Sequence, residues 1–111
     1  MSKQCTNYLG TYNNPKNFEP QEYLEMWVKK ASAVYVVGQL EKGAEGTVHI
    51  QFFINFKKPG MTIAGLKKHC SIAHFEQVRL NNGADAYCMK EDTRIDGPWE
   101  FGVKPVKRNS K

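Results

Sequence analysis

The run from Val48 to Phe56 combines apolar residues with polar residues whose side chains can bind a metal ion. Successive side chains of a strand point to opposite faces, so the apolar positions share one face and His49 and Gln51 share the other. The rise of a strand puts His49 and Gln51 about 7 Å apart. From that spacing an imidazole and an amide can converge on one cation, while the apolar face must pack against helices.

A carboxylate is available next to these two residues. The Gly-rich turn at residues 43–46 predicts a hairpin, which places Glu41 across the ladder from the His49 region. Together with Gln51 they form a mixed nitrogen and oxygen donor set, which suits Mg²⁺ or Mn²⁺ rather than a structural zinc ion. The alternative is an ordinary half-exposed strand with solvated polar side chains, because a lone H-x-Q pattern is a weak signal.

Tyr87 and Lys90 are three residues apart in a short segment with little apolar bulk. On a helix this spacing puts both side chains on one face. A phenol is protonated in neutral water, so it needs a nearby cation to act as a nucleophile. Its attack on a phosphodiester would give a 5′-phosphotyrosine and a free 3′-OH, and the retained bond energy would allow rejoining. The alternative is that Tyr87 packs the helix onto the sheet and that Lys90 is a solvated charge.

A second group of possible ligands, His69, Cys70 and His74, is close in sequence, but we interpret it as a helix end followed by a strand start. The chain has 3 cysteines and no C-x-x-C pair. This speaks against a disulfide framework or a four-cysteine zinc site and favours a reducing compartment.

The elements that must position these residues follow an alternating order. Hydrophobic periodicity, β-branched runs and turn signals predict four strands, two longer helices, a short third helix and a last short strand. This order matches the split βαβ arrangement of ferredoxin-like and RRM-like folds, an α+β class with an antiparallel sheet and two helices on one face. The predicted strands are 5–12, 34–40, 48–56, 73–80 and 99–101, and the predicted helices start at Pro20, follow Thr62 to about His69, and span 84–91.

Composition sets wider limits on the class of protein. The 111 residues suit one domain, and 41% hydrophobic with 24% charged residues is a globular balance. A net charge of +5 favours an anionic partner, nucleic acid first, although a basic soluble protein would share it. No apolar run reaches the roughly 20 residues that a membrane-spanning helix needs, and the N-terminus lacks a signal-peptide core. We therefore expect a cytosolic or nuclear protein without a membrane partner.

Three short motifs in a fixed order resemble those of a known family. Residues 10–15 read GTYNNP, residues 49–51 read HIQ, and residues 87–90 read YCMK. Each is weak alone, but their order and placement resemble the HUH endonuclease domains of replication-associated proteins from small circular single-stranded DNA viruses, the nanovirus and circovirus kind. Residues 91–100 resemble the nanovirus members in particular.

The resemblance implies a metal-dependent enzyme that nicks and joins single-stranded DNA at a viral stem-loop origin and initiates rolling-circle replication in the host cell nucleus. It implies a 5′-phosphotyrosine intermediate and Mg²⁺ or Mn²⁺ as the cofactor. The residue roles it implies are a nucleophile and a helper, Tyr87 and Lys90; metal ligands Glu41, His49 and Gln51; origin contacts Asn13 and Asn14; and base contacts His74 and Glu76.

We expect residues 1–102 to form the endonuclease domain and residues 103–111 to form a basic tail or linker. The tail is either simply solvated or adds DNA attraction or nuclear import. Because no phosphate-binding G-x-x-x-x-G-K motif is present, we expect an ATPase helicase domain to be missing from this chain. We do not expect the isolated domain to oligomerise.

The main alternative is a non-catalytic nucleic-acid-binding module of the same topology, which would stack bases on exposed aromatic side chains. Phe53 lies on the predicted open face, where it either stacks bases or packs under the helix that carries Tyr87. A purely structural protein would explain the basic charge but not the spacing of the motifs.

Overall fold

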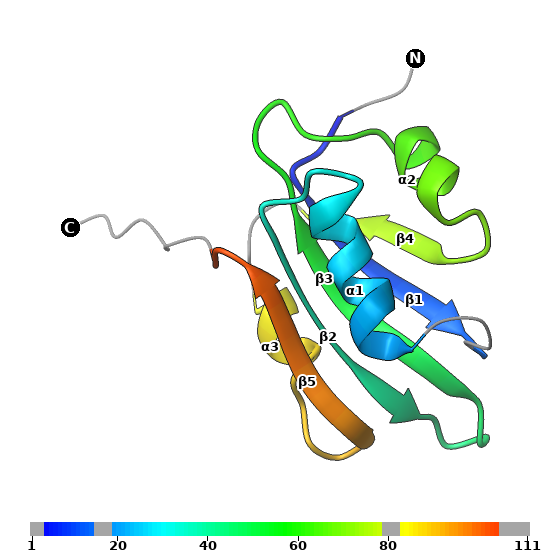
Figure 1. Ribbon diagram of the computed structural model, residues 1–111. Helices are drawn as coiled ribbons and strands as arrows, with labels where there is room; N and C mark the ends of the chain where they lie inside the picture. Colours follow the sequence, from blue (N-terminus) through cyan, green and yellow to red (C-terminus); the bar gives the residue numbers. More distant parts are fainter. Residues whose placement is uncertain (1–3, 15–18, 79–82, 105–111) are drawn as a thin grey trace.

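One antiparallel sheet of five strands, in the order β4-β1-β3-β2-β5, organises the chain (Figure 1). The computed structural model describes residues 4–14, 19–78 and 83–104. The first four strands have the predicted ferredoxin-like order, and the α+β class is confirmed. The elements are β1 (Asn7–Asn13), α1 (Pro20–Lys29), β2 (Tyr35–Lys42), β3 (Val48–Asn55), α2 (Ile63–His69), β4 (His74–Gln77), α3 (Ala84–Tyr87) and β5 (Arg94–Gly102).

Helices α1 and α2 cover one face of the sheet, as the alternation of β3 predicts. Phe52 in the centre of β3 stacks on Trp27 of α1, with the ring centroids 6.1 Å apart. Both cross-strand neighbours of Phe52 are glycines, Gly10 and Gly38. A Cβ atom at Gly38 would lie 2.7 Å from Cβ of Phe52, and one at Gly10 would run into its ring. The two glycines therefore let the ring lie flat on the sheet, which fixes β3 and the residues on its other face.

The other face of the sheet carries α3 and a second, smaller apolar cluster. Phe53 is fully buried in this cluster, against Ala84 and Cys88 from the α3 region. Of the two predicted roles for Phe53, packing under the tyrosine-bearing helix is therefore confirmed, and base stacking is excluded by its burial. The rest of this face is polar.

Two predicted boundaries are wrong by several residues. The helix predicted over 84–91 ends at Tyr87, because the chain then turns so that Lys90 reaches β2 and the segment enters β5. The last strand is longer than residues 99–101, since it pairs along β2 from Arg94 onward, with register shifts near Leu40. β5 is an edge strand, so Pro98 without an N–H is tolerated there.

The predicted strand over 73–80 is observed as the shorter β4, and residues 79–82, Pro15 and the tail from residue 105 lie outside the described residues. In the part of the chain that the structure describes, no helix is both long and apolar enough to span a membrane.

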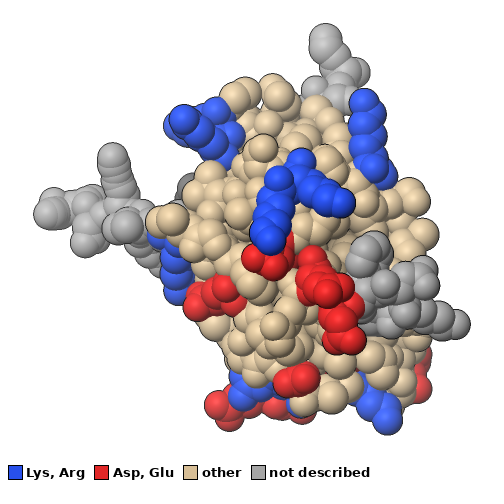
Figure 2. All heavy atoms as spheres, viewed as in Figure 1, with Lys and Arg blue, Asp and Glu red and all other residues tan. Residues whose placement is uncertain are grey.

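The face that carries α1 shows no single basic surface (Figure 2). Acidic side chains lie near its centre and separate the Lys and Arg side chains into several groups. On α1, Glu22 and Glu25 line a shallow groove with Lys29 and Lys30. A polyanion would meet both signs of charge here, so the polar face on the other side of the sheet is the better candidate for a functional surface.

Candidate active site

Glu41 and His49 are direct cross-strand neighbours at the ends of β2 and β3, as the hairpin predicts. His49 Nε2 lies 3.1 Å from Glu41 Oε1. The carboxylate is almost fully enclosed, with 2% of the side chain exposed, whereas 16% of the His49 side chain is exposed. An imidazole nitrogen and a carboxylate therefore face each other at a point that solvent reaches from the His49 side.

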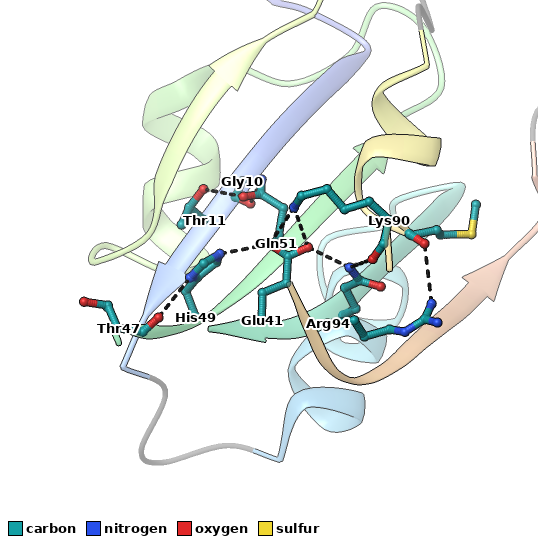
Figure 3. Close-up of polar contacts among 10 residues, drawn as sticks. Gly10, Thr11, Glu41, Thr47, His49, Gln51, Lys90 and Arg94 are labelled. Atoms are coloured by element: carbon teal, nitrogen blue, oxygen red, sulfur yellow. Dashed lines mark hydrogen bonds and ion pairs between the residues drawn. The ribbon is translucent and has the colours of Figure 1, made fainter. Parts of the chain in front are cut away.

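Lys90 reaches the same carboxylate from the segment that follows α3 (Figure 3). Its Nζ lies 2.9 Å from both carboxylate oxygens of Glu41 and 4.4 Å from the ring centroid of Tyr87. Although Lys90 does not share a helix with Tyr87, the turn after α3 still brings the two side chains together. The structure thus joins the predicted nucleophile, its predicted helper and a predicted metal ligand in one chain of contacts.

Neighbouring charge and hydrogen bonds both change the pKa of Glu41. Burial alone would raise the pKa of this carboxyl, but hydrogen bonds from Lys90, Gln39 and His49 and the charge of Lys90 outweigh that effect. The pKa of Glu41 therefore lies below its usual value. Glu41 is ionised at neutral pH, as a metal-binding carboxylate must be.

Gln51 is the next polar residue along β3, and 7% of it is exposed. Its Nε2 donates to the backbone carbonyl of Gly10 over 3.0 Å, which fixes the direction of the amide. Its Oε1 accepts a long hydrogen bond of 3.4 Å from the hydroxyl of Thr11. The amide oxygen therefore keeps the capacity to bind another group.

A hollow of about 320 Å³ opens on this polar face. Its lining residues come from β1, β3, β4 and α3, and they are Leu9, Thr11, Gln51, His74, Glu76 and Tyr87. The hollow brings predicted metal-binding, DNA-binding and nucleophilic residues into one concave surface. Glu41 and His49 do not line it; Gln51, two residues after His49 on the same face of β3, is the predicted metal ligand that does.

Tyr87 differs from the other tyrosines in exposure: 48% of it is accessible. The other four tyrosines have at most 3% exposure, and burial raises the pKa of each phenol. These four are Tyr8, Tyr12, Tyr23 and Tyr35. Tyr87 is thus the tyrosine whose hydroxyl a polymer substrate could reach.

The predicted DNA contacts lie on two neighbouring strands, β1 and β4, and in the turn after β1. Asn13 is the cross-strand neighbour of His49, and Asn14 follows with a positive φ of 52°. His74 and Glu76 lie on the edge strand β4, where their exposed side chains are 3.2 Å apart. All four side chains are exposed, and none is tied into the core.

Gln39 is a residue of the site that was not predicted from the sequence. It lies two residues before Glu41 in β2, is fully buried, and donates from Nε2 to Glu41 Oε2 and to the backbone carbonyl of Lys90, both over 2.7 Å. The sequence held one signal for it, since Gln39 has the same alternation as Glu41 in a strand that is otherwise mostly apolar.

The interpretation of His69, Cys70 and His74 as a helix end and a strand start is confirmed, because α2 ends at His69 and β4 begins at His74. The ring of His69 packs edge-on against Trp27 with 5.8 Å between the centroids, and His74 pairs with Glu76 instead. Within the described ranges, no three His, Cys, Asp or Glu residues are grouped to hold a metal ion. A metal site at Glu41 and His49 therefore depends on the amide of Gln51 as its third protein ligand.

The exposed Tyr87 is thus joined through Lys90 to the pair of Glu41 and His49, on a five-stranded antiparallel sheet. The family model of viral replication proteins (Viral_Rep) matches residues 5–91. The chain therefore belongs to the viral replication protein family, and the resemblance inferred from the three motifs is confirmed.

Individual relatives point to nanoviruses and to a circovirus. The chain is 42% identical over 103 residues to the Master replication protein of Faba bean necrotic yellows virus, which covers 92% of this chain and 33% of that protein. It is 34% identical over 103 residues to the Master replication protein of Banana bunchy top virus, with the same shares. It is 35% identical over 91 residues to the Replication-associated protein of Beak and feather disease virus, covering 78% of this chain and 29% of that protein. The chain spans about a third of the length of these relatives.

Proposed function

We propose that this domain cuts and rejoins single-stranded DNA at a viral replication origin, with Tyr87 as the nucleophile, and so initiates rolling-circle replication. One observation carries the proposal: the exposed tyrosine lines the same hollow as Gln51 and touches the lysine that binds Glu41. The role in viral replication is also supported by the family and by the names of the relatives.

In the proposed reaction, the hydroxyl oxygen of Tyr87 attacks the phosphorus of a phosphodiester and passes its proton to water. The bond from phosphorus to the 3′ oxygen breaks, which leaves a 5′-phosphotyrosine and a free 3′-OH. The number of phosphodiester bonds is unchanged, so a later 3′-OH can reverse the step and join DNA. The ammonium group of Lys90, 4.4 Å from the Tyr87 ring, offsets negative charge that develops during the attack.

We propose Mg²⁺ or Mn²⁺ as the cofactor, held by Glu41, His49 and Gln51. The donor set fits: an ionised carboxylate, an imidazole nitrogen 3.1 Å from it, and an amide oxygen with one long hydrogen bond. When bound, a divalent ion polarises a phosphate oxygen and offsets charge in the transition state. A cation held by Glu41 would compete with Lys90 for the carboxylate, so Lys90 would release at least one of its two bonds to Glu41.

Single-stranded DNA fits the position of the nucleophile better than duplex DNA. Tyr87 projects from a short helix on a sheet face, where a paired and stacked strand cannot easily present its phosphate. Asn13 and Asn14 at the end of β1, and His74 and Glu76 on the neighbouring strand β4, are proposed to contact the DNA strand at the hollow. The buried Phe53 removes the aromatic platform that a non-catalytic base-stacking module would use.

A cleavage assay tests the proposal. The protein is incubated with Mn²⁺ and a labelled pool of single-stranded hairpins with randomised loops, and the products are separated on a denaturing gel. We expect a slowly migrating protein–DNA adduct that disappears with Tyr87→Phe or with a chelator. DNA that binds but gives no adduct from any pool would favour a binding module, and cleavage that survives Tyr87→Phe would exclude the proposed nucleophile.

A further inference from the structure

Gln39 joins two parts of the site that are far apart in the chain. Its amide nitrogen is 2.7 Å from Oε2 of Glu41, on the same strand, and 2.7 Å from the carbonyl oxygen of Lys90 in the segment after Tyr87. The side chain is fully buried between them. No other side chain in the described part of the chain bonds both to a predicted metal ligand and to the backbone of this segment.

The arrangement requires an amide. Both partners of Nε2 are acceptors, so the reverse orientation would set the Gln39 carbonyl oxygen against two oxygens. The two hydrogens of the –NH₂ group satisfy both partners at once. In this orientation Oε1 of Gln39 is buried without a hydrogen-bond partner, which is energetically unfavourable.

The segment that carries Tyr87 has few other anchors to the sheet. Helix α3 has only four residues and is held by the burial of Ala84 and Cys88 and by a 3.5 Å ion pair between Asp85 and Lys104. The side chain of Lys90 is bound to Glu41, and the proposed metal would take over oxygens of that carboxylate. The bond from Gln39 goes to the backbone of Lys90, so it can persist when the lysine side chain moves.

We infer that Gln39 is a positioning residue, which holds the segment of Tyr87 and Lys90 at a fixed place relative to Glu41. The inference rests on the proposed function. Gln39 acts through Glu41 and the Lys90 carbonyl and does not touch DNA. Its loss should therefore slow the attack of Tyr87 without weakening the binding of metal or DNA by a similar factor.

Gln39→Met tests this inference, because methionine has a similar length and no donor. We expect the rate of adduct formation at saturating DNA and Mn²⁺ to fall by about tenfold or more. The dissociation constant for Mn²⁺, read from the spin-resonance signal of the free ion, and that for DNA should change by less than about threefold. The matched control is Asn55→Leu, which removes a 2.7 Å bond to Asn7 on the same sheet face, away from the site. The control should retain the wild-type rate.

Hydrogen exchange without DNA or metal separates this inference from the proposed function. Gln39→Met should speed amide exchange in residues 87–94, and Asn55→Leu should not. If the wild-type protein forms no adduct but the exchange result holds, the proposed function fails and the anchoring role stands. An unchanged rate and exchange, or equal losses in rate and in both affinities, would overturn the inference. Gln39→Leu is the second variant, and failure of both variants to fold would also contradict it.

Discussion

The bond from Lys90 to Glu41 leads to a prediction in which metal affinity and reactivity change in opposite directions. Lys90 Nζ is 2.9 Å from both oxygens of the carboxylate that would bind the proposed cation. Replacing Lys90 with methionine, which keeps the length of the chain, removes this competitor. We therefore expect Lys90→Met to bind Mn²⁺ more tightly than the wild-type protein and to form the DNA adduct more slowly.

The size of the expected gain in Mn²⁺ affinity follows from the burial of the ion pair between Lys90 and Glu41. Exposed ion pairs contribute about 0–1 kcal/mol, whereas removing one partner of a buried pair costs about 3–5 kcal/mol. Here 2% of Glu41 and 26% of Lys90 are exposed, which places the pair between these limits, at about 2 kcal/mol. If Lys90 releases one of its two bonds when the ion binds, half of this amount, about 1 kcal/mol, is recovered in Lys90→Met. That corresponds to roughly fivefold tighter binding.

The assay is a titration with Mn²⁺ at pH 7.5 without DNA, followed by the spin-resonance signal of the free ion. Arg94→Met is the matched control, because Arg94 is the cross-strand neighbour of Glu41 and has 27% side-chain exposure but no bond to that carboxylate. Its affinity should stay within about twofold of the wild type. An unchanged or weaker affinity in Lys90→Met, or an equal gain in Arg94→Met, would refute the displacement argument.

Three further predictions follow from the same contacts. His49→Ala should remove cleavage while keeping most of the salt-dependent binding to single-stranded DNA, and persistent cleavage on a denaturing gel would show that the metal assignment is wrong. Cys88 is fully buried and its pKa is raised by burial, so iodoacetamide should label it in the native protein more slowly than the partly exposed Cys5 and Cys70; mass spectrometry showing Cys88 labelled first would contradict its packing. The pKa of Glu41 is lowered in the folded state, so its contribution to stability is present above the ordinary value of 4.5 and is lost as the pH falls through the folded-state pKa. Chemical unfolding measured across the acid range should show a weaker pH dependence in Glu41→Gln, and identical slopes would argue against that contribution.

Local patterns predicted most of the sheet and part of the site. The length of the hairpin and the period of a strand were enough to place Glu41 opposite His49, because both rules depend only on neighbouring residues. The same period separated Phe52, in the helix-covered core, from His49 and Gln51. It could not decide whether Phe53 was exposed, since that depends on α3 packing over it from a distant part of the chain.

The contacts around Lys90 were not predictable in this way. A helical pattern continues past Tyr87 in the sequence, but bonds to Glu41 and Gln39 end it early, and these partners come from about 50 residues earlier. Gln39 itself looks like any polar residue of a half-exposed strand. Gln39 links β2 to the segment after α3 only because Lys90, which is distant in sequence, packs over β2 in the folded chain.

The most direct measurement of the central claim is the position of the covalent link to DNA. After reaction with Mn²⁺ and single-stranded origin-like DNA, the adduct is digested with nuclease and trypsin and analysed by mass spectrometry. We predict a nucleotide mass on the peptide of residues 80–90, with fragments that assign it to Tyr87. A link at any other residue, or cleaved DNA with a free 5′-phosphate and no linked peptide, would contradict the account.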